Sequence, residues 1–226
     1  MTYWAYDFSK VILRLYFRFG FGLELLGSAH VPPSGPFILA SNHVSFLDPP
    51  LLGAACPRRL RFMARADLFD HPLLGAYLRG VHVVPLKRGE SDLGAIHHAI
   101  RLLHDGEVLA IFPEGGRQRS GRLGFAKRGV GLLAETARVP IVPVLVQGTF
   151  EAWPPEATRP RRTKIRVAFG PAIPYTVGPA LALGVSTPES KRPEAGARVS
   201  RARHERLADA VTSAWRQLAQ QLAATS

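Results

Sequence analysis

The chain has 226 residues, 46% of them hydrophobic, so it can bury one sizeable core and falls in the size range of a single domain. Its 29 lysines and arginines against 17 aspartates and glutamates give a net charge of +12, which favours polyanionic partners such as anionic lipid, nucleic acid or a phosphorylated substrate. The one cysteine, Cys56, excludes an internal disulfide, and no stretch reaches the roughly 20 apolar residues that a membrane-spanning helix needs.

The first predicted element is an amphipathic helix from about residue 4 to residue 19. Lys10, Arg14 and Arg18 recur every four residues and form one basic stripe on such a helix, while apolar side chains cover the rest. A helix of this kind can lie in a membrane interface with its cations on lipid headgroups. The pattern is also compatible with a helix packed on the domain core. We assign residues 1–26 to a membrane-associating segment.

Residues 27–175 are expected to form a single α/β domain, because short apolar runs alternate with helical patterns from Pro36 onward. The sheet is expected to be mixed and mostly parallel, with helices flanking it. One helix should run from an N-cap at Ser91 to about residue 105, and another from about residue 127 to residue 138, before Pro140. Strands are predicted at residues 36–40, 60–64, 81–86, 107–112, 141–147 and 164–169.

The end of the chain has two predicted parts. Residues 176–200 are rich in Pro, Gly, Ala and Ser and lack periodicity, which is typical of a loop or linker. Residues 201–226 are predicted to form a closing amphipathic helix, because Leu207, Val211, Trp215 and Leu218 recur at helical spacing.

Asn42 and His43 follow the strand predicted at residues 36–40. Open α/β sheets usually place ligands at the carboxyl-terminal edge of their strands. Asp48 comes five residues after His43, which on a continuous helix would put the side chains about 140° apart. If a turn separates them and Asp48 caps a helix starting at Pro49, the carboxylate can fix the imidazole tautomer and leave the other ring nitrogen as a general base. Taken alone, the pair is also compatible with a helix cap and a structural histidine.

A second group, Phe112-Pro113-Glu114-Gly115-Gly116-Arg117, follows the strand predicted at residues 107–112, with Lys127 downstream. Glycine allows a ligand to approach the backbone, and Arg117 supplies a bidentate donor suited to phosphate. Glu114 is expected to accept hydrogen bonds from substrate hydroxyls or to hold Arg117. Neither GxxxxGK[ST] nor GxGxxG is present, which disfavours nucleotide binding. An ordinary glycine turn with solvated charges is the alternative.

Two further segments complete the pattern. The strand predicted at residues 81–86 leads into Lys87 and Arg88. Arg88 could bind the same substrate phosphate as Arg117, and the alternative is a solvated surface cation. The run from Val139 to Val144 holds two prolines, which indicates an edge or irregular strand lining a pocket, with plain core packing as the alternative.

Together these segments resemble the glycerolipid acyltransferase family, whose best-known members acylate lysophosphatidic acid. The family's blocks are NHxxxxD, a glycine-to-arginine strand, FPEGTRS and a VPIVPV-like run. They stand here, in that order, at residues 42–48, 80–88, 112–118 and 139–144.

The resemblance implies acyl transfer from acyl-CoA or acyl carrier protein to the free hydroxyl of a lysophospholipid, above all 1-acyl-glycerol-3-phosphate, giving phosphatidic acid. It implies no metal and no cofactor beyond the thioester co-substrate. The expected location of the protein is an anionic membrane surface at the cytoplasmic face, to which it binds as a peripheral or monotopic protein. The residues implied are His43 as general base, Asp48 to orient it, and Asn42, Arg88, Glu114, Gly115, Arg117 and Lys127 for substrate binding.

Gly116 and Gln118 stand where the family usually has Thr and Ser, so two hydroxyl donors are missing and glycerol 3-phosphate or another lysolipid stays open as acceptor. A competing function is nucleic-acid binding through the basic run at residues 159–166, but no recognised motif accompanies it. A hydrolase function is disfavoured because the sequence contains neither a GxSxG nucleophile elbow nor an HExxH zinc motif. A non-catalytic membrane-binding relative is the remaining alternative.

Overall fold

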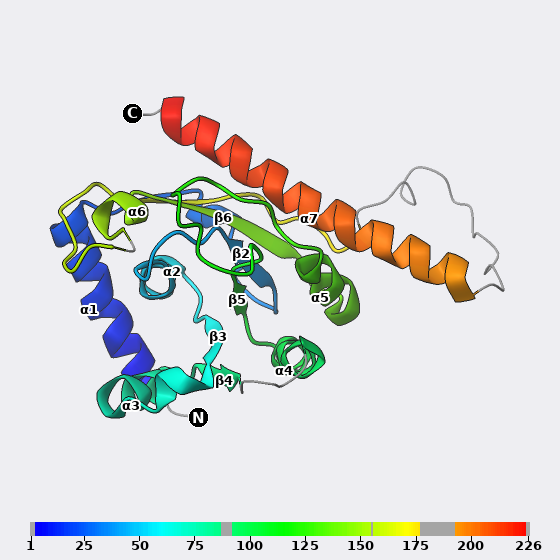
Figure 1. Cartoon of the computed structure of the whole chain (residues 1–226), viewed down its shortest axis with the longest axis horizontal. Coiled ribbons are helices and arrows are strands. Elements are labelled where there is room, and N and C mark those ends of the chain that lie inside the picture. The colour runs from blue at the N-terminus through cyan, green and yellow to red at the C-terminus, as the bar shows by residue number, and fades with distance from the viewer. Residues whose placement is uncertain (1–2, 87–91, 155, 177–192, 225–226) are drawn as a thin grey trace.

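A seven-stranded sheet forms the centre of the computed structural model, which describes residues 3–86, 92–154, 156–176 and 193–224 (Figure 1). The strands are β1 (Glu24–Leu26), β2 (Ile38–Ser41), β3 (Arg61–Arg65), β4 (Val84–Leu86), β5 (Leu109–Ile111), β6 (Ile141–Gln147) and β7 (Arg166–Phe169). Their order is β1-β7-β6-β2-β5-β3-β4, and only β6 and β7 pair antiparallel. The prediction of a mixed, mostly parallel sheet is confirmed.

The helices cover both faces of this sheet (Figure 1). They are α1 (Trp4–Phe21), α2 (Asp48–Ala55), α3 (Pro72–Gly80), α4 (Asp92–His104), α5 (Gly129–Ala137), α6 (Thr149–Ala152) and α7 (Pro193–Ala224), with short 3-10 turns η1 (Ser28–His30) and η2 (Ala66–Phe69). Helices α1 and α2 pack on one face, and α4, α5 and α7 pack on the other.

Strand β6 shows why the sheet is apolar on both sides. Val142, Val144 and Val146 belong to the core cluster shared with α1 and α2. Ile141 and Leu145 belong to the cluster shared with α4, α5 and α7. Because alternate side chains of a strand point to opposite faces, a strand covered on both sides is a continuous apolar run. The expectation of an edge strand is therefore wrong, since β6 lies between β2 and β7 and its first six residues are buried.

Several parts of the chain differ from the sequence prediction, among them helix α6 and the strand predicted at residues 81–86, which begins only at Val84. Helix α7 begins at Pro193, so the last part of the segment predicted as a loop is helical, and residues 177–192 lie outside the described part. Strand β1 and helix α3 were not predicted. A three-residue strand is too short to show alternation, and it is held by backbone pairing with β7. The proposed N-cap Ser91 also lies outside the described residues.

Helix α1 is apolar on two opposite sides. Tyr6, Phe17 and Phe21 are buried against the core, so the helix does pack on the domain. The opposite side exposes large apolar side chains, among them Trp4, Phe8, Val11, Ile12, Leu15 and Phe19. The interpretation as a helix packed on the domain core is confirmed, and the membrane-interface interpretation stays a prediction. None of the helices in the described ranges combines the length and apolar character needed to cross a bilayer.

Candidate active site

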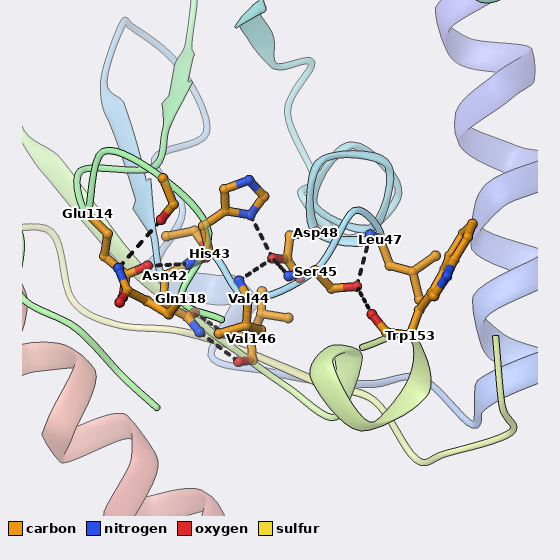
Figure 2. A network of polar contacts seen from close by, with 12 residues as sticks. Asn42, His43, Val44, Ser45, Leu47, Asp48, Glu114, Gln118, Val146 and Trp153 are labelled. Carbon is orange, nitrogen blue, oxygen red and sulfur yellow. Dashed lines mark hydrogen bonds and ion pairs between the residues drawn. The ribbon is translucent and has the colours of Figure 1, made fainter. Parts of the chain in front are cut away.

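Strand β2 ends at Ser41 and delivers His43 to the carboxyl-terminal edge of the sheet (Figure 2). Nδ1 of His43 lies 2.8 Å from Oδ2 of Asp48. A turn separates the two residues, with the N–H of Asp48 donating to the carbonyl of Ser45 at 3.3 Å. The five-residue spacing therefore forms a direct pair because the chain turns before α2 begins.

Asp48 does not cap α2 in the way the sequence suggested. The helix begins at Asp48 itself, and no side-chain cap is made by the preceding residue. The fully buried carboxylate faces back along the chain, where Oδ2 also accepts from the N–H groups of Val44 at 2.7 Å and Ser45 at 2.8 Å. Three donors thus converge on one oxygen, and these charge-assisted bonds hold the turn and the imidazole together.

Phe112 supports the imidazole from one side. Its ring stacks on His43 with centroids 4.0 Å apart and an interplanar angle of 20°. The His43 side chain is 16% exposed, and no described residue makes a hydrogen bond to its Nε2. The ring is therefore oriented by Asp48 and Phe112 while Nε2 stays available. The sequence offered Phe112 as the start of a motif, but nothing in the pattern assigned it this role.

Glu114 holds the backbone of His43. Its side chain is buried, with Oε2 accepting from the N–H of His43 at 2.8 Å and Oε1 accepting from the N–H of Gly124 at 2.8 Å (Figure 2). Burial raises the pKa of this carboxyl, although the two N–H donors favour its charged form. On the other side, the N–H of Gln118 donates to the His43 carbonyl at 2.8 Å. Both oxygens of Glu114 are thus occupied, and no contact with Arg117 is formed.

Asn42 faces away from the imidazole. Its side-chain Nδ2 donates to the carbonyl of Val146 at 3.0 Å, and its Oδ1 accepts from the N–H of Val146 at 2.8 Å. The residue is buried. Asn42 is thus a clamp between the end of β2 and β6, and it also lines a second cavity together with Val44, Gly121 and Phe150. Its part in substrate binding stays a prediction.

The predicted phosphate-binding cations occupy different places. Arg117 lies over the exposed ring of Phe46, with its guanidinium carbon 3.5 Å from the ring centroid. Lys127 lies across Gly115, whose φ of 77° and missing side chain allow this approach, since a Cβ there would be 2.5 Å from the lysine Nζ. Arg88 lies outside the described residues. Arg117 and Lys127 both lie on the loop between β5 and α5.

An apolar cavity of about 410 Å³ lies on the far side of Phe112, the ring that stacks on His43. It lies between α1, α2, β3 and the η2–α3 segment, and Phe112 and Phe46 belong to its wall. The same two rings therefore contact the site residues His43 and Arg117 and also line the cavity. Other wall residues are Tyr6, Leu13, Gly53, Phe62, Leu74 and Leu78.

This arrangement has a defined chemical capacity. A histidine with one nitrogen on a carboxylate can accept a proton at the other. Exposed Arg and Lys side chains can bind a phosphate, and an apolar cavity can hold an alkyl chain. Among the described residues, no group of three His, Cys, Asp or Glu side chains is placed to hold a metal ion.

Comparison with known families gives one match over residues 23–147, to the model described as Acyltransferase. The matched range contains His43, Asp48, Glu114 and Arg117. It ends at Gln147, the last residue of β6.

Several curated proteins are similar to this chain. The 1-acyl-sn-glycerol-3-phosphate acyltransferase of Bacillus subtilis is 28% identical over 144 residues, which cover 63% of this chain and 71% of that protein. The chloroplastic protein of the same description from Arabidopsis thaliana is 34% identical over 66% of this chain, and the human alpha form is 30% identical over 73%. The chain spans only 39% of the Arabidopsis protein and 59% of the human one.

The fold is also found among solved structures. The crystal structure of the 1-acyl-sn-glycerophosphate acyltransferase of Thermotoga maritima superimposes with a TM-score of 0.65, at 24% sequence identity. The superposition covers 89% of this chain and 77% of the other.

Proposed function

The chain belongs to the acyltransferase family, and from that premise we propose that it transfers a fatty acyl group from a thioester to the free hydroxyl of a lysophospholipid. The preferred acceptor in this proposal is 1-acyl-glycerol-3-phosphate, and the product is then phosphatidic acid. The names of the curated relatives support this choice. The observation that carries the proposal is the His43–Asp48 pair, whose imidazole stacks on Phe112, a residue of the apolar cavity wall.

His43 is the general base in this reaction. Because an ionised carboxylate only accepts hydrogen bonds, the contact with Asp48 puts the ring proton on Nδ1 and the lone pair on Nε2. Nε2 takes the proton of the acceptor hydroxyl as its oxygen attacks the thioester carbonyl carbon. The tetrahedral intermediate then collapses, the C–S bond breaks, and the imidazolium returns the proton to the leaving thiolate. Asp48 stabilises the imidazolium between the two steps.

Arg117 and Lys127 are the proposed contacts for the acceptor's phosphate. A guanidinium gives a phosphate two parallel hydrogen bonds, and the lysine adds a point charge. The family resemblance assigns Arg88 to the same group. Glu114 does not contact the phosphate in this proposal. Its side chain is buried, and its two oxygens hold the backbone N–H groups of His43 and Gly124.

The fatty acyl chain is proposed to enter the apolar cavity. Its wall is almost entirely apolar, and transfer of an alkyl chain from water into such a cavity is favourable. Because Phe112 lines the cavity and stacks on His43, a chain in the cavity brings its carboxyl carbon close to Nε2. Acyl-CoA and acyl carrier protein are the proposed donors.

Helix α1 supports a membrane location for this activity. Its outer side exposes Trp4, Phe8 and Phe19, while Arg14 and Arg18 lie exposed along one flank. Aromatic side chains suit the acyl boundary of a bilayer, and flanking cations suit anionic headgroups. We place the protein at an anionic surface on the cytoplasmic side.

The test is a matrix of acceptors and donors with purified protein on lipid vesicles. The acceptors are 1-acyl-glycerol-3-phosphate, glycerol 3-phosphate and lysolipids with other headgroups, each offered with acyl-CoA and with acyl carrier protein. We expect transfer to 1-acyl-glycerol-3-phosphate at the highest kcat/KM. Transfer to glycerol 3-phosphate alone would move the assignment to that acceptor, and an empty matrix would contradict the proposal.

A further inference from the structure

Helix α3 and the turn η2 before it form a helical segment that lies almost entirely outside the core. Of the nine residues of α3, only Gly75 is buried. Leu73 of α3 is 80% exposed, and Leu74 and Tyr77 of the same helix are also exposed, as is Leu68 of η2. Exposed large apolar side chains on a segment this short are costly in water unless another surface covers them.

Gly75 shows how this segment is held. A Cβ at this position would lie 2.2 Å from the carbonyl oxygen of Phe69, so α3 packs backbone to backbone on η2. The apolar side chains of α3 are therefore not needed for its contact with η2. Part of their surface lines the cavity, through Leu74, Tyr77 and Leu78, and the rest faces outward.

The exposed side of α3 is continuous with that of α1. The hydroxyl of Tyr77 lies 2.8 Å from that of Ser9, and α3 lies at the amino-terminal end of α1 (Figure 1). That end of α1 exposes Trp4 and Phe8. The two helices also share the cavity, since Tyr6 and Leu13 of α1 line it together with Leu74 of α3. The apolar surface outside the protein and the cavity inside it are thus bounded by the same elements.

The charges around this surface favour a bilayer as its partner. Arg79 stands exposed at the carboxyl-terminal end of the η2–α3 segment, and Lys10 lies on the neighbouring flank of α1, while Arg65 at the other end of the segment is paired with Asp67. An apolar patch edged with cations matches an anionic lipid surface, which offers headgroup charge at its rim and hydrocarbon beneath. A second copy of the chain is a poorer partner, because two molecules with a net charge of +12 repel each other.

We propose that η2 and α3, residues 66–80, form a second membrane-inserting element beside α1. With both elements in the bilayer, an acyl chain passes from the hydrocarbon to the cavity between walls that α1 and α3 share. This second statement rests on the proposed function, whereas the insertion of α3 stands on the exposed surface alone. Binding to vesicles requires no turnover, so the two can fail separately.

Fluorescence quenching tests the insertion directly. Leu73→Trp is made in a Trp4→Phe background and mixed with vesicles of phosphatidylcholine and phosphatidylglycerol that carry brominated acyl chains. The background protein alone gives the signal of the native Trp153 and Trp215, which is subtracted. The matched control is Val199→Trp in the same background, since Val199 is 57% exposed on the distant helix α7. We expect bromine to quench the tryptophan at position 73 and to leave that at position 199 unaffected. Equal quenching at both positions, or none at position 73, would overturn the proposal.

Vesicle partition gives a second readout. Leu73→Ser should weaken binding to these vesicles roughly tenfold, because a leucine no longer enters the hydrocarbon. Val199→Ser should leave binding unchanged. The measurement is repeated in the His43→Ala background, where loss of transfer cannot affect it. If Leu73→Ser instead dissociates an oligomer in sedimentation velocity and vesicle binding stays constant, the surface is covered by a second copy and the proposal is wrong.

Discussion

The N–H of His43 donates to Oε2 of Glu114 at 2.8 Å, so the backbone of the proposed base is fixed by a residue 71 positions further along the chain. The other oxygen of Glu114 binds the N–H of Gly124, which joins the loop after β5 to the same point. A change at Glu114 should therefore act on the reaction through the position of His43 and not through contact with substrate.

Glu114→Gln tests this positioning role. Glutamine offers one acceptor oxygen where glutamate offers two, so either His43 or Gly124 loses its partner. We expect kcat to fall by about tenfold, a loss near 1.4 kcal/mol, with little change in KM for the acceptor. Steady-state kinetics at varied acceptor concentration measure kcat and KM separately. The control Glu156→Gln removes an exposed carboxylate and should change neither constant. A selective rise in KM would show instead that Glu114 contacts the acceptor.

Asp48→Asn tests the charge that faces His43. The asparagine oxygen can keep the three hydrogen bonds made by Oδ2, while its NH₂ takes the place of Oδ1, which has no partner among the described residues. The imidazolium then lacks its counter-charge, and kcat should fall by about 10²- to 10⁴-fold. The unpaired NH₂ should lower the free energy of unfolding by about 1–3 kcal/mol. Retention of wild-type kcat in a folded variant is the contrary result.

Gly53→Leu tests the proposed acyl cavity. Gly53 lies on α2 in the cavity wall, and a Cβ there would be 3.9 Å from the Tyr6 hydroxyl, which is ordinary contact. Leucine should fill part of the cavity and shift the preferred donor to shorter chains, since each methylene that no longer fits costs roughly 1–3 kcal/mol. Gly53→Ala is the matched control and should keep the wild-type profile. Competition between acyl donors of different lengths measures the shift, and an unchanged profile in the leucine variant places the chain elsewhere.

Gly131→Ala tests the packing of α7 on α5. A Cβ at Gly131 would lie 2.3 Å from the backbone oxygen of His204, so the two helices must move apart. We expect the free energy of unfolding to fall by about 1–3 kcal/mol in urea denaturation. Gly129→Ala on the same helix is the control, because nothing lies within 4 Å of the added Cβ. Equal stability of the two variants would mean that this contact is absent in solution.

The sequence predicted the parts of this structure that depend on local patterns. The strands from β2 to β7 are apolar runs next to turn residues, and the turn between His43 and Asp48 follows from their spacing and from the prolines after Asp48. The buried face of α7 also follows from periodicity, with Trp215 donating from Nε1 to the carbonyl of Ala40 at 3.1 Å.

Contacts between segments that are distant in the chain could not be predicted from the sequence. Nothing local indicates that Asn42 binds the backbone of Val146, or that Glu114 binds that of His43, because these partners meet only in the folded sheet. Helix α3 was missed for a different reason. Its inward side is limited to Leu74, Tyr77 and Leu78, which line the cavity, and the single helical turn that they span is too short to show a period in the sequence.

The most direct test of the account is the rate of acyl transfer by His43→Ala on vesicles containing 1-acyl-glycerol-3-phosphate. We predict a loss of at least about 10²-fold in kcat, because no other described group is placed to take the hydroxyl proton beside Phe112. Vesicle binding and thermal unfolding should stay close to wild type, since the side chain is partly exposed and outside both core clusters. Transfer at the wild-type rate by the folded variant would contradict the assignment of His43 as the base.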